Sequence, residues 1–221
     1  MKISIIMSVF NNSKTLKRSI ESILNQDYKN FEFLIMNDSS TDSTKEILKN
    51  YKDTDARIKI YENNKNLGLT KSLNILVNNA KGELIARQDA DDYSVNDRFS
   101  TQVEFLKSYN LDGCTSRSKV ISTGKVRPGL SHFLPIKLAI RYKNPFIHGT
   151  LLIKKKVLQD VGNYDENFYY AQDYKLFKDL IDKGYKIKSI NKFLYYLNTE
   201  NNISSNMKKE QNYYAKLVRR S

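Results

Sequence analysis

Apolar runs and amphipathic segments alternate through the first half of the chain, and no other feature of the sequence constrains the fold as strongly. Apolar runs at residues 3–10, 31–36, 57–61 and 84–88 have the length and composition of buried strands. Each of the first three precedes a segment whose apolar side chains recur at helical spacing. Strands and helices that alternate in this way form a parallel sheet with right-handed crossovers. We therefore predict an α/β fold with a mostly parallel central sheet and helices on both faces.

The helices and the second half are predicted from finer patterns. Ser13 is the expected N-cap of the first helix, and Ser43-Thr44-Lys45-Glu46 matches a capping box ahead of the second. Residues 96–205 alternate less regularly, with a strand expected over residues 146–153 and a helix that starts near Gln172-Asp173. Because the chain has only 8 Gly and 3 Pro among 221 residues, we expect this less regular half to be fused to the first without a linker.

Three polar turns follow the predicted strands. In open parallel sheets ligands bind beyond the carboxyl ends of the strands, so these turns form the candidate site. Asp89-Ala90-Asp91-Asp92 packs three carboxylates within four residues, which repel one another unless a hard divalent cation neutralises them. Bound Mg²⁺ or Mn²⁺ commonly holds substrate phosphates. The alternative is a plain acidic turn, since Asp bonds readily to its own backbone. The turns are Asn11-Asn12, Asn37-Asp38-Ser39-Ser40-Thr41-Asp42 and Asp89-Ala90-Asp91-Asp92.

Several common classes of protein are excluded by the sequence. Neither Gly-x-x-x-x-Gly-Lys-Ser/Thr nor Gly-x-Gly-x-x-Gly occurs, so the chain is not a P-loop or an ordinary dinucleotide-binding protein. The single Cys114 has no partner for an internal disulfide. The apolar run at the start of the sequence is broken at Asn11-Asn12, so it is expected to be a strand and not a signal peptide. No apolar run reaches the ~20 residues that a membrane-spanning helix needs. We expect a cytoplasmic protein.

A formal net charge of +13 favours polyanionic partners. Lysines are spread along nearly every segment, so part of this charge belongs to an ordinary solvated surface. Residues 206–221 form a basic C-terminal helix or tail in which Tyr213, Tyr214 and Leu217 interleave with Lys and Arg. This pattern is typical of a helix that lies on an anionic membrane. We expect a peripheral contact with the inner face of the cell membrane, and we do not expect nucleic acid as a partner.

Five features, in order, resemble those of family 2 glycosyltransferases of the GT-A fold. The resemblance covers about residues 1–205, and the joint order is more specific than any one feature. It implies one GT-A (Rossmann-like) domain, in which residues 1–95 bind a nucleotide sugar and residues 96–205 bind the acceptor. The features are the strand ending in Val9-Phe10-Asn11, the turn from Asn37 to Asp42, Asn66-Leu67-Gly68 before a helix, Asp89-Ala90-Asp91-Asp92, and Gln172-Asp173 at a helix start.

The resemblance implies a donor site for a nucleotide-diphosphate sugar, with a UDP-sugar as the expected donor. Val9, Phe10 and Asn11 would line the pocket for the base and ribose, where Asp38 would act as a ligand. The alternative for Asp38 is a role in the turn itself. Asp42 is expected mainly to cap the following helix.

The same resemblance implies the groups that would carry the chemistry. Asp91 would be the main ligand of Mn²⁺ or Mg²⁺, Asp89 would reach the ribose, the metal or a metal-bound water, and Asp92 would support the loop or the sugar. Asp173 would be the general base of an inverting transfer, with helix capping as the alternative. His148 would approach the acceptor or the diphosphate.

Two departures from the family pattern affect the donor site. Gln172 stands where relatives often carry Glu, and Tyr196-Leu197-Asn198-Thr199 stands where they often carry Tyr-Arg-x-His. The following Asn202-Ile203-Ser204 resembles the usual continuation. Without that Arg and His the diphosphate has less positive charge nearby. Either a nearby lysine substitutes, or the donor binds weakly without a partner.

Three functions follow from these residues. The first is an inverting, metal-dependent transfer of sugar to a saccharide or lipid-linked acceptor, in the synthesis of a bacterial surface polysaccharide or glycolipid. The second is a non-catalytic basic binding module that retains the fold, which Asp89, Asp91 and Asp173 argue against. The third is a metal-dependent nucleotidyltransferase, in which Gln172-Asp173 would have no evident purpose.

Overall fold

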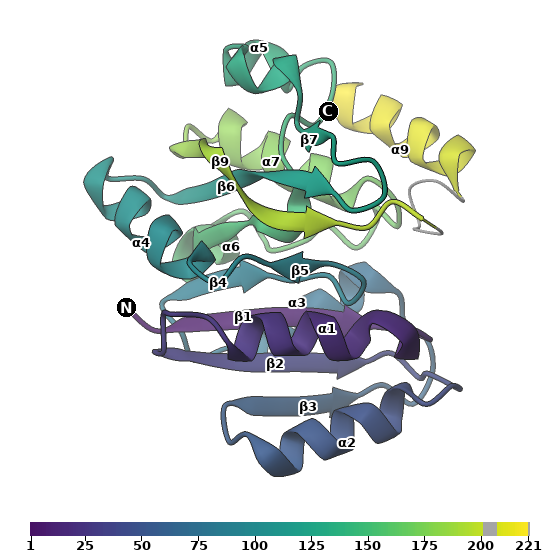
Figure 1. Ribbon diagram of the computed structural model, residues 1–221. Helices are drawn as coiled ribbons and strands as arrows, with labels where there is room; N and C mark the ends of the chain where they lie inside the picture. The colour runs from purple at the N-terminus through teal and green to yellow at the C-terminus, as the bar shows by residue number, and fades with distance from the viewer. Residues whose placement is uncertain (201–206, 221) are drawn as a thin grey trace.

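A computed structural model describes residues 1–200 and 207–220. Asn202-Ile203-Ser204 therefore lies outside the described residues. Within them, one nine-stranded sheet runs through the molecule in the order β3-β2-β1-β4-β8-β6-β9-β5, and β7 pairs with β6 (Figure 1). The first half contains β1 (Ile3–Val9), α1 (Ser13–Leu24), β2 (Phe31–Asn37), α2 (Thr44–Thr54), β3 (Ile58–Glu62), α3 (Leu69–Asn79), β4 (Leu84–Arg87) and β5 (Tyr93–Ser94). The second half contains α4 (Arg98–Ser108), β6 (Gly113–Val120), β7 (Val126–Arg127), η1 (Leu130–Phe133), α5 (Ile136–Ala139), η2 (His148–Thr150), β8 (Leu152–Lys154), α6 (Lys155–Asp160), α7 (Gln172–Asp182), β9 (Ile187–Leu197) and α9 (Lys208–Arg220).

The predicted parallel half of the sheet is confirmed. β1 pairs in parallel with β2 and β4, and β2 pairs in parallel with β3. Successive side chains of a strand point to opposite faces, so Ile5 and Met7 enter one apolar core while Ile6 enters the other. This explains why β1, β2 and β4 are apolar at almost every position.

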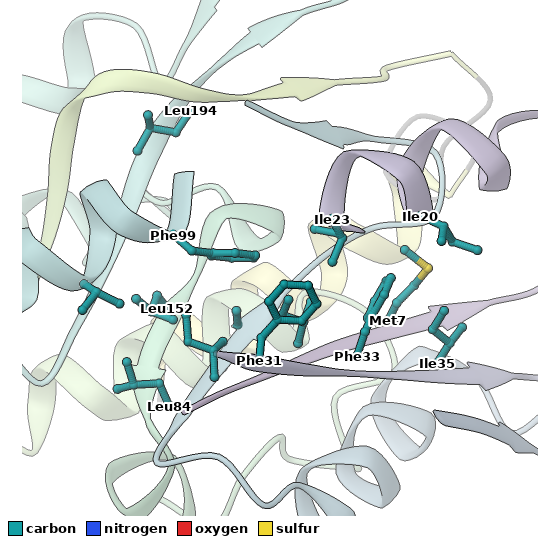
Figure 2. Close-up of a cluster of buried hydrophobic side chains, with 14 of the residues drawn as sticks. Met7, Ile20, Ile23, Phe31, Phe33, Ile35, Leu84, Phe99, Leu152 and Leu194 are labelled. Atoms are coloured by element: carbon teal, nitrogen blue, oxygen red, sulfur yellow. The ribbon is translucent and has the colours of Figure 1, made fainter. Parts of the chain in front are cut away.

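Helices cover both faces of the sheet, as predicted. Ile20 and Ile23 of α1 pack with Phe33 of β2 and Phe99 of α4 in the first core, which Figure 2 shows. On the opposite face, α3, α6 and α7 bury their apolar sides in the second core. Two cores of this size fix the sheet from both sides and hold its strand ends in register.

The second half adds antiparallel and mixed pairs. β8 is antiparallel to both β4 and β6, while β6 is parallel to β9. The strand predicted over residues 146–153 is wrong for most of its length, because the chain makes the turn η2 before β8 begins at Leu152. The Thr150 N–H and hydroxyl both donate to the Ile147 carbonyl, at 3.1 and 2.8 Å, and close this turn. The turn brings Gly149 beside the acidic loop after β4.

Ser43 is the N-cap of α2, but it makes no side-chain capping bond, so the predicted capping box does not form. Ser13, predicted as the N-cap of α1, is instead its first residue, and Asn12 is the N-cap. Asp42 makes side-chain bonds at both helix starts instead. Its Oδ1 accepts the Thr44 N–H at 3.0 Å, and its Oδ2 accepts the Ser13 N–H at 3.0 Å. Burial raises the pKa of Asp42, but the hydrogen bonds from Thr44 and Ser13 outweigh it and lower the pKa to about 2. The expected capping role of Asp42 is confirmed, and it serves α1 and α2 together.

The basic C-terminal helix α9 lies against the body of the protein. Val218 is fully buried in the second core, and the Tyr214 ring packs against Phe168. Much of its apolar side is therefore covered by protein and is not available to a membrane. In the part of the chain that the structure describes, no helix is long and apolar enough to cross a bilayer.

Candidate active site

The strand-end residues of β1 have different environments. Val9 is buried in the first core, and its carbonyl accepts the Asp38 N–H at 2.9 Å. Phe10 is about half exposed, and Asn11 adopts a left-handed backbone with φ 47°. The Asn11 Oδ1 accepts the Thr41 N–H at 2.8 Å, which joins the β1 and β2 turns. Of the three residues predicted to line the base pocket, Phe10 and Asn11 are at the surface and Val9 is not.

Asp38 is buried and holds the loop before α3. Its Oδ1 accepts the Asn63 side-chain N–H at 2.7 Å and the Leu67 N–H at 2.9 Å, and its Oδ2 accepts the Gly68 N–H at 2.9 Å. Gly68 has φ 83°, a conformation that favours glycine. The two sequence features at Asp38 and at Asn66-Leu67-Gly68 thus belong to one hydrogen-bonded unit.

Arg87, which was not predicted from the sequence, supports the acidic loop from the side of the protein core. It is fully buried at the end of β4, where its Nη2 forms an ion pair with Asp89 Oδ1. Its Nη1 donates to the carbonyls of Gln88 at 2.6 Å and Ile6 at 3.2 Å. Its position two residues before the acidic cluster is the sequence signal that could have identified it. This ion pair fixes one carboxylate oxygen of Asp89 and leaves the other on the side of Gly149.

Gly149 allows a close approach that no larger residue could. A Cβ at this position would lie 2.8 Å from Asp89 Oδ2 and 2.5 Å from the Tyr195 hydroxyl oxygen. That hydroxyl in turn accepts the Asp89 N–H at 3.0 Å. Burial, with the charges of Asp92 and Asp89, raises the pKa of Tyr195 well above its usual value, so the phenol stays neutral. The η2 turn and β9 therefore support the loop through Gly149 and Tyr195.

Asp91 and Asp92, the other two carboxylates of the loop, lie where negative charge exceeds positive charge. Burial and the charge of Asp89 raise the pKa of Asp91 to about 6. Burial, Asp89 and Asp91 raise the pKa of Asp92 well above its usual value. The buried Asp92 accepts the Asn198 N–H at 2.6 Å, which anchors the segment after β9. A cation placed among these groups would stabilise their charged forms.

The oxygen atoms available here suit a hard divalent cation whose remaining coordination positions are filled by a bound substrate. Asp91 and the free side of Asp89 offer carboxylate oxygens, which Mg²⁺ and Mn²⁺ prefer. Among residues 1–200 and 207–220, no group of three or more His, Cys, Asp or Glu side chains is placed to hold a metal. One or two carboxylates together with substrate phosphates are the usual arrangement for Mg²⁺. The residues present fit such an ion.

Asp173 stands at the start of α7 and faces the same region. Its Oδ2 accepts the Asn144 side-chain N–H at 2.7 Å, and its Oδ1 accepts the Tyr174 N–H at 2.8 Å. Burial is the main cause that raises the pKa of Asp173, and the charge of Asp89 adds to it. The Asp89 carboxylate is thus near enough to act on Asp173, although 84 positions separate them in the sequence.

His148 and Tyr164 form a hydrogen-bonded pair near Asp89 and Asp173. His148 Nε2 lies 2.8 Å from the Tyr164 hydroxyl. Burial and the charge of Arg87 lower the pKa of His148 well below its usual value, so the imidazole is neutral at pH 7. Burial raises the pKa of Tyr164 well above its usual value, and the charges of Asp89 and Asp173 add to this. Neither ring therefore adds net charge to the site.

Arg18 of α1 supplies positive charge near the loop from the solvent side. Its guanidinium lies 4.4 Å from the centre of the Tyr93 ring, which stacks on Tyr196. Arg18 is also among the charges that lower the pKa of Asp91. The segment from Tyr196 lacks the Arg and His of the family pattern, and an arginine from a different element is the cation next to it. Sequence reasoning looked for a lysine here and missed this residue.

Acidic side chains after β4 and at the start of α7 agree with the resemblance to GT-A glycosyltransferases in the sequence. The structure brings Asp89, Asp91, Asp92, His148 and Asp173 together. It places Asp38 in the neighbouring loop unit and Val9 in the core.

Comparison with known proteins identifies the family. Residues 4–181 match the family model described as glycosyl transferase family 2, and the chain belongs to this family. It is 31% identical over 211 residues to WfaP of Escherichia coli, covering 94% of this chain and 82% of WfaP. WfaP is named UDP-Glc:alpha-D-GlcNAc-diphosphoundecaprenol beta-1,3-glucosyltransferase.

Solved structures show the same fold. S. aureus TarS 1-349, in complex with UDP-GlcNAc, matches with a TM-score of 0.83 at 20% identity over 99% of this chain and 65% of TarS 1-349. Mannosyltransferase PcManGT from Pyrobaculum calidifontis, in complex with GDP-Man and Mn²⁺, matches with a TM-score of 0.78 at 17% identity over 98% of this chain and 64% of PcManGT. The chain spans less than two thirds of the length of either structure.

Proposed function

We propose that this glycosyltransferase moves a sugar from a nucleotide-diphosphate sugar to a hydroxyl of a lipid-linked saccharide, with inversion at the anomeric carbon. The observation that carries the proposal is the closeness of two acidic sites, the loop at Asp89 to Asp92 and Asp173, since the charge of Asp89 raises the pKa of both Asp91 and Asp173. The acidic loop is suited to hold the donor diphosphate through a cation, and Asp173 is suited to act as the proton acceptor. A UDP-sugar is the proposed donor, supported by the UDP-sugars that WfaP and TarS use or bind.

In the proposed reaction the acceptor oxygen attacks the anomeric carbon from the face opposite the diphosphate. The bond from this oxygen to carbon forms as the bond from carbon to the diphosphate oxygen breaks, and the hydroxyl proton passes to the Asp173 carboxylate. A raised pKa makes Asp173 a better proton acceptor than an exposed Asp. Asn144 keeps the carboxylate oriented through its bond to Oδ2.

Asp91 and Asp89 are the proposed ligands of Mn²⁺ or Mg²⁺. The bound cation would neutralise the departing diphosphate as a Lewis acid. Arg18 is the proposed second source of positive charge, since it lies over Tyr93 beside the loop. Phe10 and Asn11 are proposed to contact the nucleoside, and His148 to position Tyr164 between the two acidic sites.

The acceptor class rests on WfaP, whose name specifies a saccharide on diphosphoundecaprenol. A lipid-linked acceptor implies work at a membrane, and synthesis of a surface polysaccharide or glycolipid. We propose that the protein acts at the cytoplasmic face of the cell membrane, where nucleotide sugars are available.

A panel of nucleotide sugars with Mn²⁺ or Mg²⁺ tests this function. We expect at least one UDP-sugar to raise the melting temperature and to be hydrolysed slowly or transferred to a diphosphate-linked saccharide. Asp91→Asn should remove the metal-dependent part of both signals. If no nucleotide sugar is bound, the protein is a binding module that retains the fold. Release of diphosphate from a nucleoside triphosphate would instead indicate a nucleotidyltransferase.

A further inference from the structure

About three quarters of the excess positive charge comes from one stretch of the sequence. Residues 113–159 contain no Asp or Glu and ten Lys or Arg, so this stretch contributes +10 of the formal +13. The other 174 residues contribute only +3. Four of the ten, Arg127, Lys137, Arg141 and Lys143, are exposed and lie in or beside η1 and α5. The basic residues are Arg117, Lys119, Lys125, Arg127, Lys137, Arg141, Lys143, Lys154, Lys155 and Lys156.

Exposed apolar side chains are concentrated in the same place. Leu130, Phe133 and Tyr142 are 88%, 65% and 67% exposed, and Leu134 and Leu138 are about half exposed. All five belong to the segment that contains η1 and α5, at the top of the view in Figure 1 and at the opposite end from α2. Soluble proteins rarely expose apolar side chains this densely unless they cover a binding surface.

We propose that residues 127–143, here called the docking surface, bind the anionic surface of a lipid bilayer. Apolar and aromatic side chains flanked by Lys and Arg are the composition of segments that lie in a membrane interface. Anionic headgroups attract each nearby basic residue, and the stretch carries no acidic side chain to oppose that attraction. The basic end of α9 joins this surface, because Arg219 Nη1 donates to the Tyr142 carbonyl at 3.2 Å.

The charge distribution favours a bilayer over a second copy of the chain as the occupant. Two copies that met through this surface would bring two acid-free basic stretches together, and like charges in an interface repel. An anionic membrane has the opposite charge and accepts exposed leucine and phenylalanine side chains.

The docking surface is connected directly to Asp173. Asn144, the residue after this surface ends, donates to Asp173 Oδ2 at 2.7 Å. Within the surface, the Ile140 carbonyl accepts the Tyr174 hydroxyl at 2.7 Å. A bilayer bound here would therefore lie next to the start of α7. This inference rests on the proposed function in one respect: membrane binding would serve to bring a lipid-linked acceptor hydroxyl to Asp173.

Co-sedimentation with sealed vesicles tests the proposal. We expect the protein to bind vesicles that contain phosphatidylglycerol and to bind much less to pure phosphatidylcholine. Lys137→Glu with Arg141→Glu should lower the binding constant by at least about tenfold, since each basic residue contributes to attraction at an anionic surface. The control is Lys49→Glu with Lys52→Glu on the exposed side of α2, which changes the net charge equally at the far end of the molecule.

A second pair of variants tests the apolar contribution. Phe133→Ser should weaken binding to the anionic vesicles, while Tyr109→Ser, which removes an aromatic ring that is 57% exposed elsewhere, should not. Far-ultraviolet circular dichroism and melting temperatures confirm that each variant is folded.

The results separate this proposal from the proposed function. Vesicle binding that is absent, or that all four variants retain equally, overturns the docking surface. Self-association in sedimentation velocity that Phe133→Ser abolishes, without vesicle binding, overturns it in favour of a second copy. Because UDP binding is measured without vesicles, its loss would count against the transferase and leave the docking result unaffected.

Discussion

Arg87 and Asp89 form an ion pair at the end of β4, with the Arg87 side chain fully buried beneath the acidic loop. The pair lies between the protein core and the proposed donor site. It holds one oxygen of Asp89, and the charge of Arg87 partly offsets the rise in the pKa of Asp91.

Arg87→Met should destabilise the protein and weaken donor binding. The substitution leaves Asp89 without its partner, and breaking a largely buried ion pair costs about 3 kcal/mol. The measurements are the free energy of unfolding in urea and the affinity for UDP. Arg87→Lys keeps the charge but loses the two-pronged geometry, so it should lie between Arg87→Met and the wild type. Unchanged stability in Arg87→Met would contradict this role.

Asp173→Asn should abolish transfer while UDP binding is retained. The amide preserves the shape and can still bond to its neighbours, but it cannot accept the acceptor proton, and loss of a general base costs about 10²–10⁴-fold in rate. Transfer at near wild-type rate in this variant would show that Asp173 is not the base.

The pH dependence of transfer should reflect the raised pKa of Asp173. Since the base acts as a carboxylate, activity is lost as the pH falls through that pKa and is recovered above it. The limb should therefore lie above the usual range of an Asp. Because the pKa of Asp91 is also raised, to about 6, the profile is measured with saturating Mn²⁺, which suppresses that second titration. An acidic limb at the ordinary pKa of Asp would contradict the burial of Asp173.

Gly149→Ala should lower transfer by at least about tenfold, since misplacing a catalytic loop by a fraction of an ångström has effects of this size. The added methyl carbon would collide with Asp89 Oδ2 and the Tyr195 hydroxyl. Steady-state transfer measures the effect. The matched control is Gly129→Ala, where a Cβ meets nothing within 4 Å, and both variants are measured without vesicles so that the docking surface plays no part. Equal activity in the two variants would contradict the close approach at Gly149.

Glu32 should stabilise the protein at neutral pH and lose this effect in acid. It is buried, and it accepts bonds from the Ser4 hydroxyl at 2.6 Å, the Lys81 N–H at 2.6 Å and Lys59 Nζ at 2.5 Å. Burial raises its pKa, but these bonds outweigh burial and lower the pKa to about 2. Its contribution is therefore present above its unfolded pKa and is lost as the pH falls toward 2.

Glu32→Gln tests this contribution. The variant should be less stable than the wild type at pH 7 by about 2 kcal/mol, because it weakens bonds to a buried carboxylate. The difference in unfolding free energy should shrink as the pH is lowered. A difference that is independent of pH between 7 and 3 would show that the charge of Glu32 is unimportant.

The sequence was sufficient for the parts of the molecule that local patterns determine. β1, β2 and β4 are predicted from apolar runs, since a strand buried on both faces is apolar at almost every position. β3, at the edge of the sheet and only partly buried, is predicted from a weaker pattern that includes Lys59. The start of α7 and the capping role of Asp42 were likewise readable from a few adjacent residues.

Other parts depend on contacts between distant residues and could not be predicted. The Tyr195 hydroxyl reaches Asp89 across 106 positions, and the Asn198 N–H reaches Asp92 across 106 positions. A strand is predicted across the turn η2 because the apolar Phe146-Ile147 and Leu151-Leu152-Ile153 flank it. The conformation of the turn is set by Thr150 bonding to Ile147 and Ser116. No local pattern distinguishes these cases.

The central claim is that Asp91 holds a divalent cation together with the donor diphosphate. Isothermal titration of UDP with and without Mn²⁺, for the wild type and Asp91→Asn, tests it most directly and requires no knowledge of the sugar or acceptor. We predict that Mn²⁺ tightens UDP binding to the wild type at least about tenfold and has little effect on Asp91→Asn. An equal effect of Mn²⁺ on both proteins would contradict the account.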